Sequence, residues 1–217
     1  MHKRNIPLCL PLKTLSPEAA LISYPNAIRL LPKLVLASDV FRQLSCYYRS
    51  IRCEFQLMGF VEREDENVFR VTELAINPQY VGITHADNDT LMFSDFLREL
   101  ELRGKDIGNL RLQAHSHGML ESYFSCRDVD TICDSYACDW MISMVGNIRL
   151  DLKARLDIFE PVPLSISLPI FVESSLSEIN APVVSVEEKS AEEAAWLMQL
   201  LKQMRPGMEV AGEVFHG

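Results

Sequence analysis

Two histidines separated by a single residue, His115 and His117, are the first feature of this sequence with a clear chemical use. In an extended segment, residues at that spacing point to the same side of the backbone, so both imidazoles can reach one ion. Asp128 follows near the start of a predicted helix, where a chain reversal can return its carboxylate to the two rings. Two nitrogen ligands and one oxygen ligand leave a tetrahedral zinc one open position for water, as in catalytic sites. We therefore predict one catalytic Zn²⁺ held by His115, His117 and Asp128.

The segment SCRD, from Ser125 to Asp128, also has the form of a capping box. In that interpretation both side chains only satisfy free backbone N–H groups at a helix start, and no metal is needed. The complete pattern H-x-H-x7-S-x2-D favours the metal site, because the chain has only 5 histidines. From average composition, this joint pattern arises by chance on the order of one time in a thousand.

The elements predicted around these residues mix strands and helices without regular β–α alternation. A short buried strand over 110–114 delivers the sequence HSHG at its carboxyl end, and a helix begins at Ser125. The Gly146–Asn147 pair predicts a hairpin between the first two of three later strands. The other predictions are helices over 39–50 and 89–103, strands over 54–61, 68–76, 140–147, 148–159 and 163–172, and a final amphipathic helix over 187–204. The pattern indicates an α+β domain with a mixed, largely antiparallel sheet flanked by helices.

The chain divides into three predicted segments. Residues 1–36 form a proline-punctuated arm, and residues 37–175 carry the strands, the helices and the candidate site. Residues 176–217 begin as a Ser- and Glu-biased linker and end in the amphipathic helix, with acidic residues at its start and basic residues at its end, as the helix dipole prefers.

Composition limits the classes of partner. The formal charge of -9 argues against a phosphate-binding surface and therefore against nucleic acid. The 6 cysteines contain no CxxC pair and lack the spacing of a disulfide-rich secreted domain. No secretion signal is evident, and no run of about 18 apolar residues indicates a membrane span. We therefore expect a cytoplasmic protein that contacts no membrane.

The pattern His115, His117, Ser125 and Asp128 resembles the metal-binding signature of the JAMM, or MPN-plus, metallopeptidases, in which a glutamate on an early strand precedes these positions. The resemblance covers roughly residues 37–160. The short chain looks like a stand-alone prokaryotic or phage member of that family. It implies a zinc isopeptidase or peptidase on a deaminase-like α/β sandwich. The implied substrate is a ubiquitin-like protein or its conjugate, cut at the modifier's C-terminal tail. The implied partners include activating and conjugating enzymes of the same pathway.

Two residues of the first predicted strand are candidates for the general base. In many JAMM relatives the glutamate stands three residues before a glycine of that strand, and this rule reaches Gln56. Glu54 lies two residues earlier on the same strand face, so we predict Glu54 as base and Ser125 as hydrogen-bond donor to the oxyanion. Glu62 and Glu64, in a predicted solvated turn, are weaker candidates. With Gln56 at the base position, the alternative function is a catalytically inactive MPN-type scaffold.

The cysteines offer weaker chemistry. Cys126 as a nucleophile would have only a metal-bound histidine as its base, so a structural or surface thiol is the better interpretation. Cys133 and Cys138 with His85 have spacing too loose for a convincing second zinc site. A zinc hydrolase of small molecules is a third functional hypothesis, because fold and metal do not fix the substrate.

Overall fold

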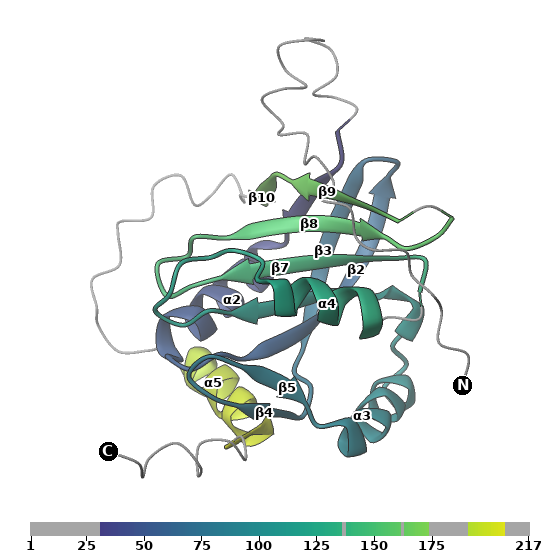
Figure 1. The fold of residues 1–217 in the computed structure, drawn as a ribbon. Helices are drawn as coiled ribbons and strands as arrows, with labels where there is room; N and C mark the ends of the chain where they lie inside the picture. The colour runs from purple at the N-terminus through teal and green to yellow at the C-terminus, as the bar shows by residue number, and fades with distance from the viewer. Residues whose placement is uncertain (1–30, 136–137, 162, 174–190, 207–217) are drawn as a thin grey trace.

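The structure is a computed structural model that describes residues 31–135, 138–161, 163–173 and 191–206 (Figure 1). The predicted linker and most of the predicted arm lie outside the described residues. The described elements follow in the order β1 (Lys33–Leu36), α2 (Ser38–Ser50), β2 (Gln56–Asp65), β3 (Val68–Ala75), β4 (Gln79–Val81), β5 (Ala86–Asn88), α3 (Thr90–Leu102), the 3-10 helix η2 (Ile107–Asn109), β6 (Leu110–Ser116), α4 (Cys126–Ser135), β7 (Trp140–Gly146), β8 (Lys153–Ile158), β9 (Leu164–Leu168), β10 (Ile170–Val172), α5 (Ala191–Gln203) and β11 (Met204–Pro206).

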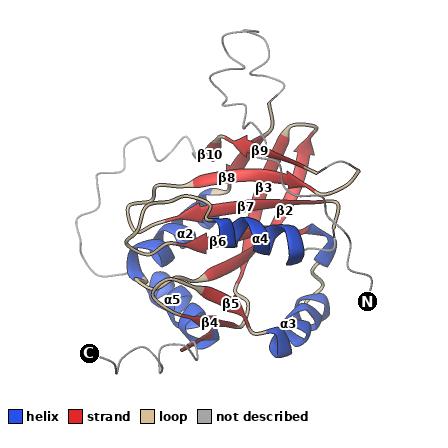
Figure 2. Ribbon diagram, viewed as in Figure 1, coloured by secondary structure: helices blue, strands red, loops and turns tan. Residues whose placement is uncertain are grey.

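The strands form an eight-stranded sheet in the order β10-β1-β3-β2-β6-β7-β8-β9 and a three-stranded sheet in the order β11-β4-β5. In the large sheet, β1 pairs parallel with β10 and β3, and β6 pairs parallel with β7. The other four neighbouring pairs are antiparallel. This mixed, mostly antiparallel sheet with helices packed on it confirms the predicted α+β class (Figure 2).

The two faces of the large sheet bury different groups of side chains. On one face, Tyr48 of α2 belongs to a core that includes Leu57 and Leu112. On the other face, Leu100 of α3 packs with Met58, the residue that follows Leu57 in β2. Because side chains alternate along a strand, the histidine-bearing face of β6 lies opposite to that of Leu112. The candidate site therefore lies on the side of the sheet where α4 crosses in Figure 1.

The two edge strands of the large sheet are joined at one corner. β9 and β10 are its two edge strands, yet Pro169 is the only residue between them. One residue spans at most about 3.6 Å, so the sheet curves until its edges approach each other. The backbone N–H of Leu34 donates to the carbonyl oxygen of Pro169 over 3.0 Å at this corner. The prediction of one continuous strand over 163–172 was wrong, because proline has no N–H to donate to a strand ladder.

The hairpin predicted at Gly146–Asn147 is confirmed, but its connection is longer than the two-residue turn typical of that pair. β7 and β8 do pair antiparallel, but residues 147–152 form the connection. The Asn147 side-chain oxygen accepts hydrogen bonds from the backbone N–H groups of Arg149 and Asp151, at 3.0 and 3.2 Å, and this organises a longer loop. Gly146 remains in the strand, where an added Cβ would lie 2.6 Å from Leu152 Cδ2, so close packing accounts for the glycine.

The two chain ends of the described structure both join sheets. β1 begins at Lys33, so the last four residues of the predicted arm belong to the large sheet, with Leu34 and Leu36 fully buried. At the other end, α5 packs against α2, and β11 pairs parallel with β4. None of the described helices is long and apolar enough to span a membrane.

Candidate metal centre

β6 delivers both histidines to the cleft. His115 lies within β6, paired with Gln56 of β2 on one side and Val145 of β7 on the other. His117 follows the strand end, and its backbone N–H donates to the carbonyl oxygen of Gly146 over 2.8 Å. As whole residues, His115 and His117 are 6% and 5% exposed. Strands on both sides thus hold the H-x-H segment rigidly in the extended form that the sequence predicted.

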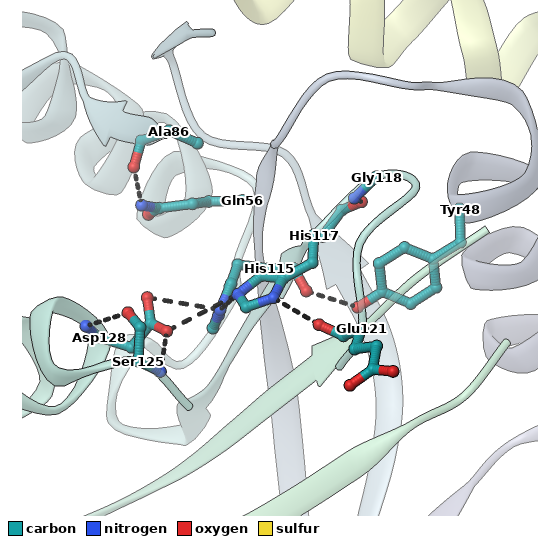
Figure 3. A network of polar contacts seen from close by, with 10 residues as sticks. Tyr48, Gln56, Ala86, His115, His117, Gly118, Glu121, Ser125 and Asp128 are labelled. Atoms are coloured by element: carbon teal, nitrogen blue, oxygen red, sulfur yellow. Dashed lines mark hydrogen bonds and ion pairs between the residues drawn. The ribbon is translucent and has the colours of Figure 1, made fainter. Parts of the chain in front are cut away.

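The ligand atoms converge as a metal site requires (Figure 3). The Nε2 atoms of His115 and His117 lie 3.2 Å apart. Asp128 Oδ1 is 3.5 Å from His115 Nε2, and Asp128 Oδ2 is 3.7 Å from His117 Nε2. A tetrahedral zinc with bonds of about 2.0 to 2.1 Å would place its ligand atoms about 3.3 Å apart. The three residues, whose ligand atoms all lie within 4.8 Å of one another, fit such an ion.

Asp128 reaches the histidines from the first turn of α4. The Asp128 backbone N–H donates to Ser125 Oγ over 3.2 Å, and the Ser125 backbone N–H donates to Asp128 Oδ2 over 2.7 Å. These reciprocal bonds form the predicted capping box. The capping and metal-binding interpretations are therefore compatible, because a carboxylate has lone pairs enough for a backbone N–H and for a metal.

The centre is strongly polarised without any ion. Burial alone would raise the pKa of Asp128, but the neighbouring rings of His115 and His117 outweigh it and hold that pKa far below its usual range. The adjacent Asp128 carboxylate raises the pKa of His117, although burial acts in the opposite direction. A carboxylate that stays ionised beside two imidazoles is a suitable ligand set for a divalent cation.

Glu54 lies just before β2 and lines the same cleft as the three ligands. Burial raises the pKa of Glu54 to about 7, with nearby His117 acting to lower it and Asp128 acting to raise it. Gln56 also lines the cleft, but its side-chain amide donates to the carbonyl oxygen of Ala86 on β5. The structure thus brings both candidate residues to the site, and Glu54 is the carboxylate among them.

The side chains that support the histidines were not identified from the sequence. The ring of Phe124 packs edge-on against His115 with ring centroids 6.2 Å apart, and the Arg155 guanidinium lies 4.7 Å from the Phe124 ring centroid. Arg155 in turn lies 2.9 Å from a carboxylate oxygen of Asp157, which is 2% exposed. Alternation within β8 could have placed Arg155 and Asp157 on one face, but nothing in the sequence pairs that face with Phe124.

The cleft has a volume of about 510 Å³ and combines residues of both sheets with α4. It is lined by Glu54, Gln56, Thr84, His85, Ala86, Asp87, Asn88, Thr90, Gln113, His115, His117, Leu120, Tyr123, Ser125, Arg127, Asp128, Thr131 and Ile132.

Other sequence candidates do not join the ligand cluster. Glu62 and Glu64 were predicted in a turn, but they lie in strand β2, exposed and away from the cleft lining. β2 extends to Asp65 because it keeps pairing with β3 to that point. Within the described part of the chain, His85, Cys133 and Cys138 form no second metal-binding group.

Comparisons with known proteins add little to this geometry. No protein-family model matches the chain, and no curated protein matches it significantly. One similar solved structure is the solution structure of protein DSY2949 from Desulfitobacterium hafniense, with 12% sequence identity and a TM-score of 0.46. The similarity covers 67% of this chain and 97% of that protein, and it supports no conclusion about function.

Proposed function

We propose that this chain is a zinc-dependent isopeptidase or peptidase that cleaves at the C-terminal tail of a ubiquitin-like or other small protein. The convergence of His115, His117 and Asp128 in a cleft that also holds the Glu54 carboxylate carries this proposal. The resemblance of the ligand pattern to the JAMM metallopeptidases supports the substrate class and a deaminase-like arrangement of the domain. Activating or conjugating enzymes of a modifier pathway would be its partners, in the cytoplasm.

Each residue of the site has a defined role in the proposed reaction. Zinc bound by the three ligands would polarise the scissile carbonyl and lower the pKa of water to about 7. Glu54 accepts a proton from the attacking water and then donates it to the leaving amine. In the metal-free chain burial raises the pKa of Glu54 to about 7, which shows that the site shields this carboxylate from water.

In the proposed reaction, Ser125 donates a hydrogen bond to the oxyanion. Its Oγ accepts the Asp128 backbone N–H, which uses an oxygen lone pair and leaves the hydroxyl hydrogen available as a donor. A hydrogen bond to the negative charge that develops on the carbonyl oxygen favours the transition state over the substrate. Capping the helix and assisting the reaction are therefore compatible for this side chain.

A cleavage assay on the zinc-loaded full-length chain tests the proposal. The substrates are a ubiquitin-like protein fused linearly to a reporter and the same protein joined to a lysine side chain. We expect wild-type cleavage of at least one of them and a loss of about 10² to 10⁴ in kcat for Glu54→Gln, with zinc content unchanged.

The inactive scaffold is distinguished in the same assay by Gln56→Glu. If the scaffold interpretation is correct, the zinc-loaded wild type cleaves neither substrate, and Gln56→Glu creates activity by supplying the missing base. If Glu54 is the base, Gln56→Glu does not increase the rate, because it removes the amide that donates to Ala86 and adds a second acid.

A further inference from the structure

Gln113 is a buried polar side chain in the cleft for which the fold provides no apparent structural role. It lies on β6, two residues before His115 and on the same face of the strand. The residue is 5% exposed and lines the cleft, and its side-chain oxygen has no hydrogen-bond partner among the described residues. A buried acceptor left unpaired destabilises the folded chain, so such a residue calls for an explanation.

The side chains paired with Gln113 on the two neighbouring strands do not satisfy this oxygen. On β2 the paired residue is Met58, which has no polar hydrogen to donate. On β7 the paired residue is Ser143, and its hydroxyl donates to Asp157 Oδ2 over 2.6 Å. A serine hydroxyl has one hydrogen, so this bond leaves none for Gln113. Gln113 itself lines the cleft, so we consider a donor bound there, which has to reach an oxygen that is buried in the unliganded structure.

The chemistry around Gln113 defines the ligand group. A carboxamide offers both an acceptor and a donor, and another carboxamide complements both. Gln113 carries no charge, so it offers no compensation for burying an ammonium or a carboxylate beside it. A neutral N–H donor therefore matches it better than a charged one does.

The position of Gln113 relates it to the proposed reaction. Two residues of an extended strand span about 7 Å, which is the distance along β6 from His115 to Gln113. That span fits one long side chain of a residue next to a scissile carbonyl held at the histidines. Thr131 and Ile132 of α4 line the same cleft and give it a mixed polar and apolar wall.

We propose that Gln113 forms a specificity subsite that binds an uncharged carboxamide side chain, asparagine or glutamine, of the substrate residue next to the scissile bond. This inference rests on the proposed metallopeptidase function. It names a substrate feature that the metal ligands themselves do not select. It also explains why a glutamine is kept unpaired at this position.

Two series of small hydroxamates test the subsite, because a hydroxamate binds zinc and presents one side chain beside it. N-acetyl amino-acid hydroxamates place the side chain before the scissile position, and substituted succinyl hydroxamates place it after. Each series carries a carboxamide, an isobutyl group of similar size, or a carboxylate. Dissociation constants are measured by calorimetry on the zinc-loaded full-length chain. In one series we expect the carboxamide to bind about tenfold tighter than the isobutyl compound.

Two variants identify the residue responsible. Gln113→Met keeps the size of the side chain and removes its polar atoms, so it should abolish the carboxamide preference while zinc content stays at the wild-type value. Gln199→Met makes the same change on the exposed surface of α5 and should keep the preference.

Each outcome separates the subsite from the metallopeptidase proposal. Hydroxamates that bind with no carboxamide preference in either series, or a preference that survives in Gln113→Met, would overturn the subsite alone. A wild-type chain that holds no zinc or binds no hydroxamate would overturn the metallopeptidase proposal together with the subsite.

Discussion

The Nδ1 atom of His117 donates a hydrogen bond to the carbonyl oxygen of Glu121 over 2.9 Å. A carbonyl oxygen can only accept, so this contact fixes the proton on Nδ1 and leaves the Nε2 lone pair for a metal. The orientation of a metal-binding imidazole is commonly set by a second contact of this kind. The backbone of residues 118–121 therefore orients the ring of His117, which is a candidate metal ligand.

Replacing Ser125 by alanine separates its two proposed roles. Loss of the cap should lower the free energy of unfolding by about 1 kcal/mol, since the Asp128 N–H loses its side-chain acceptor. Loss of an oxyanion donor should lower kcat by a further 10² to 10³, roughly the effect of removing one such donor elsewhere. Denaturant unfolding and kcat are both measured, with Ser125→Thr as the control that keeps a hydroxyl. A destabilised variant with unchanged kcat would limit Ser125 to the helix cap.

The stability of the metal-free protein should depend on pH through Glu54. Burial raises the pKa of Glu54 from 4.5 to about 7 in the folded chain, so the folded state holds this proton more tightly than the unfolded state. The stabilisation from the protonated form is complete below about pH 4.5 and is lost as pH rises through about 7. Glu54→Gln should therefore gain stability relative to wild type across this window, in urea unfolding with a chelator present. If the difference in stability between Glu54→Gln and wild type does not change with pH, Glu54 does not have the buried environment assigned to it.

Gly118 and Gly104 form a matched pair for testing the loop after His117. Both have positive φ, 54° and 77°, which costs an alanine about 1 kcal/mol. A Cβ on Gly118 would also lie 2.2 Å from the carbonyl oxygen of Arg52, whereas a Cβ on Gly104 meets nothing within 4 Å.

Gly118→Ala should therefore be destabilised by at least about 1 kcal/mol more than Gly104→Ala, because of the added backbone clash. It alone should bind zinc more weakly, by roughly tenfold or more, since its backbone continues from His117. Thermal unfolding and zinc titration measure the two effects. Equal stability and equal zinc affinity of the two variants would show that the loop after His117 accommodates a Cβ at position 118.

The convergence of the three candidate ligands was predictable because their geometry is local. Strand alternation aligns His115 with His117, and the capping box fixes Asp128 relative to Ser125. The choice between Glu54 and Gln56 was not predictable in the same way, because it depends on where β2 begins and on its pairing with β6. The general class of sheet followed from the element pattern, whereas the corner that joins the two edge strands and the longer β7–β8 loop depend on tertiary packing.

Contacts between distant segments were invisible in the sequence. The guanidinium of Arg205, in β11, lies 2.8 Å from Asp89 Oδ2 across 116 residues. Asp89 accepts the Met92 backbone N–H at the start of α3, and β11 pairs with β4 beside the cleft strand β5. The sequence predicted the helix that precedes Arg205 but had no signal for its partner.

Arg205→Ala should therefore destabilise the protein. Asp89 is 2% exposed, so removing its partner leaves a buried carboxylate with fewer hydrogen bonds, at a cost of about 1 to 3 kcal/mol. Arg42→Ala is the control, because the pair between Arg42 and Glu192 is more than half exposed on both sides and should contribute about 0 to 1 kcal/mol. Urea unfolding measures the loss in free energy of unfolding for each variant. Equal losses would mean that the Arg205 contact contributes no more than a surface ion pair.

Elemental analysis of the purified chain tests the proposed metal centre most directly. The protein is prepared without chelator as wild type, His115→Ala and His85→Ala, the last as a control because His85 lines the cleft but lies outside the ligand cluster. We predict about one zinc per chain in wild type and His85→Ala and none in His115→Ala. Folded wild-type protein without zinc, or zinc retained in His115→Ala, would contradict a metal centre formed by His115, His117 and Asp128.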